Sequence, residues 1–69
     1  MTILAKTNGD LIIIRDVKWT DKRMYYRTPF RDTNLPSLSI DRKEHGKTWD
    51  LFDDTELAIA WIFLKRKGN

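Results

Sequence analysis

Residues 2–15 read TILAKTNGDLIIIR, two short apolar segments separated by Asn8 and Gly9. Asn-Gly is the dipeptide that best tolerates the positive φ angles of a type I′ turn, so the stretch favours two strands joined in a hairpin. A helix over residues 3–17 is the alternative. Gly9 in its middle would cost about 1 kcal/mol, and three consecutive β-branched isoleucines also disfavour a helix. We therefore expect residues 1–17 to form an N-terminal hairpin.

Further strand and turn signals follow this hairpin. Residues 23–28 are rich in aromatic side chains and end at a proline, so they predict a third strand. Residues 31–36 carry turn chemistry and predict a loop. Residues 37–41 and 48–52 alternate polar and apolar side chains and predict a second hairpin. Its core face would hold four apolar side chains: Leu38, Ile40, Trp49 and Leu51.

Residues 53–67 carry the signals of a helix. Asp53 and Glu56 have the spacing of a capping box, and the basic residues 65–67 at the other end suit the helix dipole. Gly68 is placed to end the helix. One apolar stripe consists of Leu57, Ala60, Trp61 and Leu64.

Other apolar side chains make this helix hydrophobic almost all the way round. One small sheet cannot cover such a helix completely, so we expect part of its surface to be a protein interface. The residues predicted for that interface are Ile59, Trp61, Ile62 and Phe63.

The 69 residues include no cysteine and a single histidine, His45. A chain of this length forms one domain whose core contributes only about 3–5 kcal/mol, and neither a disulfide nor a Cys/His zinc site can support it. We expect an α+β fold, a small antiparallel sheet with one C-terminal helix and no metal. No apolar stretch approaches the roughly 20 residues of a membrane span, and no secretory signal is visible. The expected compartment is therefore the cytoplasm.

Charge is unevenly distributed along the chain. The formal net charge is +3, but residues 18–47 hold eight cations against four anions, whereas the charged residues of 48–64 are four acids. Cations interleaved with aromatic rings are typical of surfaces that neutralise phosphates and stack unpaired bases. The alternative is that the rings are half-buried sheet residues and that the cations only solvate the surface. The nucleic-acid candidates are Lys18, Trp19, Lys22, Arg23, Tyr25, Arg27 and Arg31, with Arg42, Lys43 and Lys47 in a second basic turn.

The four acids of residues 48–64, near the start of the helix, suggest a divalent-metal site, because hard cations prefer clustered carboxylates. Two of them already have capping roles and the pattern matches no standard ion loop, so we expect an acidic patch that contacts a basic protein. His45 is expected to be an exposed loop residue. No nucleophile with a base and no phosphate-cradling loop is visible, so we expect neither catalysis nor a cofactor.

A family resemblance covers the middle of the chain. Residues 25–41 read YYRTPFRDTNLPSLSID, and residues 49–52 read WDLF before an apolar helix. This pattern resembles the N-terminal zinc ribbon of bacterial replicative primases and of primase-like proteins of phages and mobile elements. The four zinc-ligand positions of that family are occupied by Thr28, Arg31, Leu51 and Asp54. The resemblance therefore implies the ribbon topology, with ribbon-like strands in residues 18–52, without its metal.

The resemblance also carries a functional expectation. The family's ribbon is held to bind single-stranded template DNA, and its catalysis belongs to a separate polymerase domain. This implies a non-catalytic module of a phage or mobile element that binds single-stranded nucleic acid through a basic aromatic face. The alternative is a protein-interaction module that uses the apolar helix, either as a homodimer or as an adaptor or inhibitor of a replication or host-defence protein.

Overall fold

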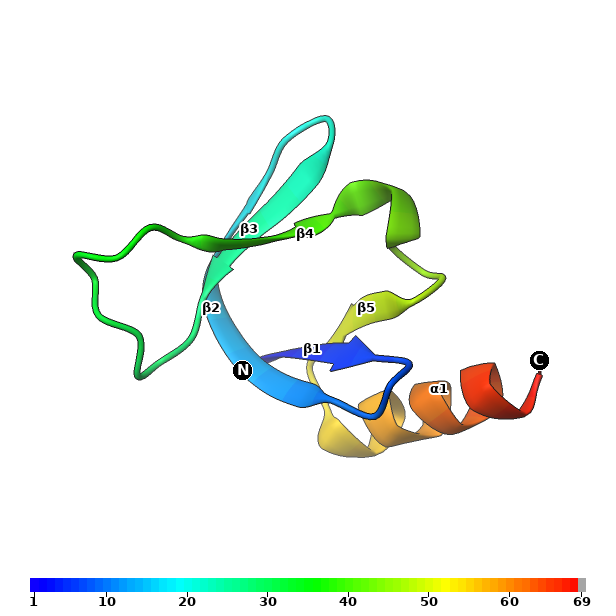
Figure 1. The fold of residues 1–69 in the computed structure, drawn as a ribbon. Helices are drawn as coiled ribbons and strands as arrows, with labels where there is room; N and C mark the ends of the chain where they lie inside the picture. Colours follow the sequence, from blue (N-terminus) through cyan, green and yellow to red (C-terminus); the bar gives the residue numbers. More distant parts are fainter. Residues whose placement is uncertain (69) are drawn as a thin grey trace.

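Five antiparallel strands form one sheet in the order β4-β3-β2-β1-β5, and a helix follows the last strand (Figure 1). The structure is a computed structural model that describes residues 1–68. Its elements are β1 (Thr2–Lys6), β2 (Leu11–Trp19), β3 (Arg23–Arg27), β4 (Leu38–Asp41), the 3-10 turn η1 (Arg42–Glu44), β5 (Trp49–Phe52) and α1 (Thr55–Lys67). The expected α+β class, a small antiparallel sheet with a C-terminal helix, is confirmed.

The strands β1 and β2 form the predicted hairpin, but their turn is not of type I′. The Gly9 N–H donates to the Lys6 carbonyl at 2.9 Å, and the Lys6 N–H donates to the Asp10 carbonyl at 2.9 Å. Gly9 has a φ of 106°, whereas Asn8 keeps a negative φ. The loop therefore holds one residue more than a type I′ turn, and glycine occupies its single left-handed position.

An extra residue in β2 bends the sheet. Arg15 lies opposite Arg27 and Lys18 lies opposite Tyr25, so β2 advances by three residues where β3 advances by two. Asp16 adopts a φ of 55° within this bulge. Such a bulge increases the local twist and bend of a strand. As a result β2 curves through the middle of the sheet and pairs with β1 at one end and with β3 at the other (Figure 1).

The main core fills the inner face of the bent sheet. Its buried side chains come from β1, β2, β3 and β5 and comprise Leu4, Ile14, Met24, Tyr26 and Trp49. Val17 also packs against this cluster, because the bulge returns its side chain to the inner face. The Trp49 indole N–H donates to the Asp41 carbonyl at 2.8 Å, which satisfies the one polar group of the largest buried residue.

The helix α1 covers the outer face of β1 and β5. Ala58 and Ile62 of the helix form a second buried cluster with Ile3 and Ala5 of β1, and two partly buried rings, Phe52 and Trp61, pack against it. Because β1 is covered on both faces, three consecutive residues of this strand are buried.

The second predicted hairpin is wrong. The strand β4 pairs with β3, and β5 pairs with β1, so the two strands lie at opposite edges of the sheet. The turn η1 and residues 45–48 carry the chain from one edge to the other. The expected core face is nevertheless present, since Leu38, Ile40, Trp49 and Leu51 all join the main cluster. An alternating pattern identifies the inward side chains of a strand but not its partner.

The helix begins one residue later than its capping pattern suggested. Asp54, not Asp53, is the N-cap, and its carboxylate accepts the Glu56 N–H at 2.8 Å. The helix ends as predicted with Gly68 at its C-cap, where the Gly68 N–H donates to the Leu64 carbonyl. The predicted stripe is wrong in part, because Ala58 and Ile62 are buried whereas Leu57 and Leu64 are exposed. Apolar residues surround the helix, so periodicity alone does not select the buried side.

We expect Leu4→Ala to lower the free energy of unfolding by about 2–5 kcal/mol, because Leu4 is fully buried and the substitution leaves a cavity. Leu11→Ala in the paired strand is the matched control, and it should cost less than about 1 kcal/mol because Leu11 is 39 % exposed. Urea unfolding followed by tryptophan fluorescence measures both. Equal losses in the two variants would contradict this placement of the core.

The cap assignment has its own test. Asp54→Ala should destabilise the protein by about 1 kcal/mol, because it removes the acceptor for the Glu56 N–H. Asp53→Ala changes the same charge one residue earlier and should alter stability by a few tenths of a kcal/mol at most. Thermal unfolding of the two variants compares them directly, and a larger effect at Asp53 would show that the helix starts elsewhere.

Candidate nucleic-acid interface

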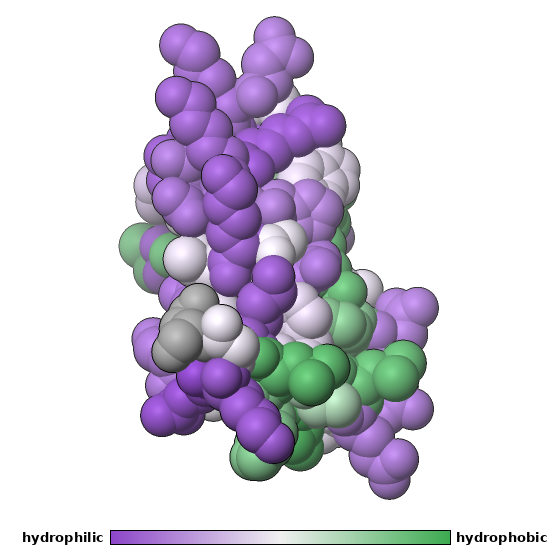
Figure 2. Space-filling model, turned by 90° about the vertical axis from the view of Figure 1, so that its right-hand side faces the viewer, coloured by the Kyte–Doolittle hydropathy of each residue, from purple (hydrophilic) through white to green (hydrophobic). Residues whose placement is uncertain are grey.

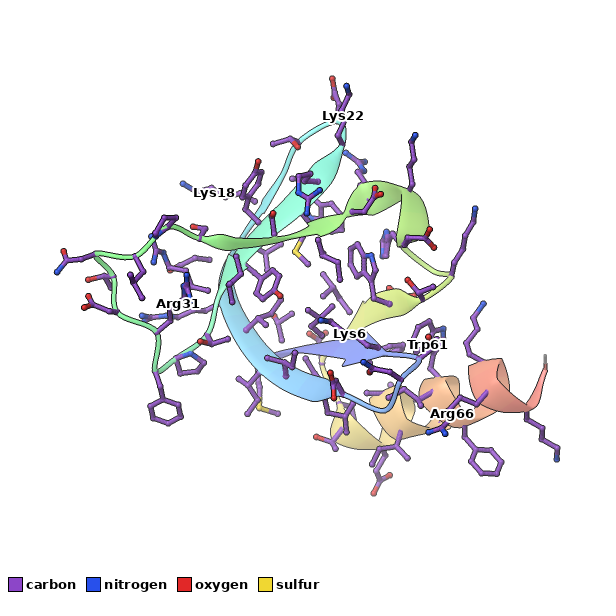
Figure 3. All side chains as sticks on the ribbon, viewed as in Figure 1. Lys6, Lys18, Lys22, Arg31, Trp61 and Arg66 are labelled. Carbon is purple, nitrogen blue, oxygen red and sulfur yellow. The ribbon has the colours of Figure 1, made fainter. Side chains whose placement is uncertain are left out.

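Basic side chains gather on the outer face of β2 and β3. Met24 and Tyr26 of β3 point into the core, so the alternating residues Arg23, Tyr25 and Arg27 point outward. Lys18 lies opposite Tyr25 and therefore shares this face. Figure 3 shows Lys22 at the tip of the turn between the two strands. We call Arg15, Lys18, Lys22, Arg23, Tyr25 and Arg27 the basic face.

Two arginines lie directly opposite each other on this face. Arg15 of β2 pairs in register with Arg27 of β3. Like charges in that position destabilise a sheet. The Arg15 guanidinium approaches the Asp16 carboxylate only to 4.0 Å, and no carboxylate of residues 1–68 forms an ion pair with Arg27, Lys18 or Lys22. The basic face thus concentrates positive charge that the described part of the chain does not neutralise.

Three arginines of the predicted set also brace the fold. The Arg23 Nε donates to the Ser39 hydroxyl of β4 at 2.8 Å. At the end of β3, the Arg27 guanidinium donates to the Leu35 carbonyl at 3.0 Å. In the loop that follows, the Arg31 Nε donates to the Pro36 carbonyl at 3.0 Å. These bonds fix the loop between β3 and β4. The guanidinium groups keep their charge at fixed positions. Within residues 1–68, the side-chain ammonium groups of Lys18 and Lys22 make no hydrogen bond, so they are free to follow a ligand.

Tyr25 and Tyr26 have opposite environments although they are neighbours. Tyr25 is half-buried and lines a shallow hollow on the basic face, beside Lys22 and Arg23. Tyr26 lies in the core, where burial raises the pKa of its phenol; the nearby Arg31 charge acts in the opposite direction. Of the two rings, only Tyr25 is therefore placed to contact a ligand on the basic face.

The remaining predicted residues lie away from the basic face. Trp19 is opposite Met24 and points to the inner side of the sheet, where its ring stacks on Trp49 with centroids 6.0 Å apart. The Arg42 guanidinium lies 5.3 Å from the Trp19 ring centroid and donates to the Thr20 carbonyl at 2.8 Å. Lys43 belongs to η1 and Lys47 to the turn before β5, so both lie in the segment that crosses from β4 to β5.

His45 is more involved in the fold than its sequence context suggested. Its ring stacks on Trp49 at a centroid distance of 4.6 Å and contacts Trp19 at 5.2 Å. Its Nε2 lies 2.8 Å from the Asp50 carboxylate. The residue lies in the segment after η1 and is exposed, as expected for a loop histidine, although one edge of its ring packs on these partners. Trp49 and Asp50 follow His45 closely in the sequence, whereas Trp19 comes from the distant strand β2.

Two residues that the sequence did not single out extend the site. Arg15 joins the basic face through its register with Arg27, and only the bulge brings it onto the same side as Lys18. The Phe30 side chain is 100 % exposed in the loop that Arg27 and Arg31 brace. A fully exposed phenylalanine beside cations is a potential stacking group for an unpaired base.

The chain matches no family model, no curated protein and no solved structure. Within residues 1–68, no helix combines the length and apolarity that crossing a membrane requires. The same residues contain no group of three or more His, Asp or Glu side chains placed to hold a metal ion.

The raised pKa of Tyr26 makes stability fall at alkaline pH. Below the ordinary tyrosine pKa of 10.0, the folded and unfolded states both keep the proton. Between 10.0 and the raised value, the unfolded state loses its proton first, so the free energy of unfolding decreases as pH rises. Urea unfolding on either side of this pH should show the decrease, and Tyr26→Phe should diminish it.

Tyr25→Phe serves as the matched control, because it removes the same group from the half-buried neighbour. It should leave the alkaline decrease unchanged. An equal response of the two variants would contradict the burial of Tyr26.

Proposed function

We propose that the protein is a non-catalytic module that binds single-stranded nucleic acid on its basic face. The observation that carries this proposal is the opposition of Arg15 and Arg27, next to lysines that have no ion-pair partner in the described chain. Residues 15–27 hold five cations against two acids. Opposed like charges lower the stability of the sheet. A surface that nevertheless concentrates them is suited to bind a polyanion.

Phosphates and bases would be bound by different groups. The braced guanidinium groups of Arg23 and Arg27 provide fixed positive charge along the strands, and Lys18 and Lys22 adapt to the positions of the phosphates. Tyr25 and the exposed ring of Phe30 offer surfaces on which bases stack, and stacking requires bases that are not enclosed in a duplex. This mechanism gives little sequence preference and a strong dependence on salt.

The resemblance of residues 16–63 to primase zinc ribbons supports the same function, since that ribbon is held to bind single-stranded template. The support concerns the binding step alone. The proposed binding uses the face of β2 and β3 and does not require the hairpin that the resemblance implied.

The proposal predicts that Lys18→Gln weakens binding to a short single-stranded oligonucleotide and makes it less sensitive to salt. For single strands the slope of log Kobs against log salt should become shallower by about 0.7, the value for one phosphate contact. Fluorescence anisotropy at a series of salt concentrations measures the slope. Lys47→Gln is the matched control, because it removes the same charge from the segment between β4 and β5 and should leave the slope unchanged.

Stacking is tested in the same assay. Tyr25→Leu keeps an apolar side chain on β3 but removes the ring, and it should weaken binding by about 1–3 kcal/mol at every salt concentration, whereas Tyr25→Phe should bind normally. No binding by the natural protein at tens of micromolar in low salt would overturn the proposal. Equal losses in Lys18→Gln and Lys47→Gln would show that the basic face is not the site.

A further inference from the structure

The outer side of α1 presents a self-complementary row of side chains. Glu56, Ala60, Phe63 and Lys67 follow the spacing i, i+4, i+7 and i+11, which keeps residues on one face of a helix. All four are exposed, since the opposite face holds the buried Ala58 and Ile62. The row begins with an acid, ends with a base, and has a small and a large apolar residue between them.

We propose that this row is a dimer interface at which α1 packs antiparallel against α1 of a second copy of the chain. The two-fold axis passes between residues 61 and 62. Glu56 then faces the partner's Lys67, and Ala60 faces the partner's Phe63. Because a two-fold interface repeats every contact, each of these pairs occurs twice. The small residue of one helix makes room for the large ring of the other.

The surface beside this row has the shape that such packing requires. Ile59 and Phe63, four residues apart, form a ridge in which Phe63 is 66 % exposed. An open apolar hollow lies on each side of the ridge. One hollow includes Leu11 of β2, and the other includes Ala60 and Leu64. Helices pack by placing such a ridge of one partner into the groove of the other. Figure 2 shows hydrophobic side chains gathered on this part of the molecule.

Charge favours a second copy in this orientation over a parallel one. Within residues 1–68, neither Glu56 nor Lys67 forms an ion pair. The helix starts with Asp54 and Glu56 and ends with three basic residues at 65–67. Antiparallel packing brings each acidic start next to the partner's basic end, whereas parallel packing brings like charges together. The helix dipoles also favour the antiparallel arrangement.

The proposed dimer interface contains none of the basic-face residues, so it is independent of the proposed nucleic-acid binding. It also corrects the sequence prediction for this surface. Ile59 and Phe63 are available to a partner, whereas Ile62 is buried against β1 and Trp61 packs partly against Phe52.

Sedimentation equilibrium from micromolar to millimolar protein tests the interface. The natural chain should approach twice the mass of one chain as its concentration rises. Ala60→Glu should remain a monomer throughout, because it places a carboxylate against the partner's Phe63 at the centre of the interface. Leu57→Glu is the control, since Leu57 is an exposed residue of the same helix outside the row, and it should dimerise normally. Circular dichroism confirms that each variant keeps its helix.

A charge exchange tests the orientation. Glu56→Lys and Lys67→Glu should each weaken dimerisation by about tenfold, because each turns two attractive pairs into two repulsive ones. The double variant Glu56→Lys with Lys67→Glu should recover most of the loss. A monomeric natural chain at every concentration, or a double variant no better than the single ones, would overturn the proposal. Anisotropy with the Ala60→Glu variant should still detect oligonucleotide binding, so the two proposals succeed or fail separately.

Discussion

The bulge at Asp16 is the feature on which both the fold and the candidate site depend. The extra residue lets β2 turn from its pairing with β1 to its pairing with β3, which closes the sheet over one core. It also returns Val17 to the interior and leaves Lys18 on the same outer face as Arg15. Without it, the alternation of the strand would send one of these two cations inward. Core packing and surface charge are thus set by one backbone irregularity.

Stability in so short a chain comes from covering β1 on both faces. Leu4 meets the inner core, while Ile3 and Ala5 meet the helix. The turn η1 and the stacked rings of Trp49 and His45 hold the segment that leads back to β5. These contacts occupy the structural role that a zinc ion or disulfides have in other small domains. The exposed side of α1 is not needed for this packing, which leaves it available for a second copy.

Local signals predicted the positions of most elements but not how they combine. The Asn8-Gly9 pair identified the first hairpin, although the loop is one residue longer than its preferred turn. The strands at residues 38–41 and 49–52 also formed where alternation placed them, yet they pair with different partners. Pairing depends on loop paths and on long-range burial, which a short pattern does not contain.

For the candidate site, too, the sequence predicted the segment but not every residue on its face. The strand pattern placed Lys18, Arg23, Tyr25 and Arg27 in one segment, and the structure brings them to one face. Trp19 belongs to the other face, and Arg15 was missed. Both assignments depend on the bulge, and no residue type in this segment predicts a bulge. The contact between His45 and Trp19 joins segments distant in the sequence, so it too was beyond a local pattern.

The most direct test of binding on the basic face is an NMR titration of the isotope-labelled protein with a short single-stranded oligonucleotide. If the basic face binds the oligonucleotide, the backbone amides of Arg15 to Arg27 on β2 and β3 shift first and furthest, while those of the α1 row stay nearly unchanged. Shifts concentrated on α1, or in the segment between β4 and β5, would contradict it. So would a spectrum that does not respond to the oligonucleotide at low salt.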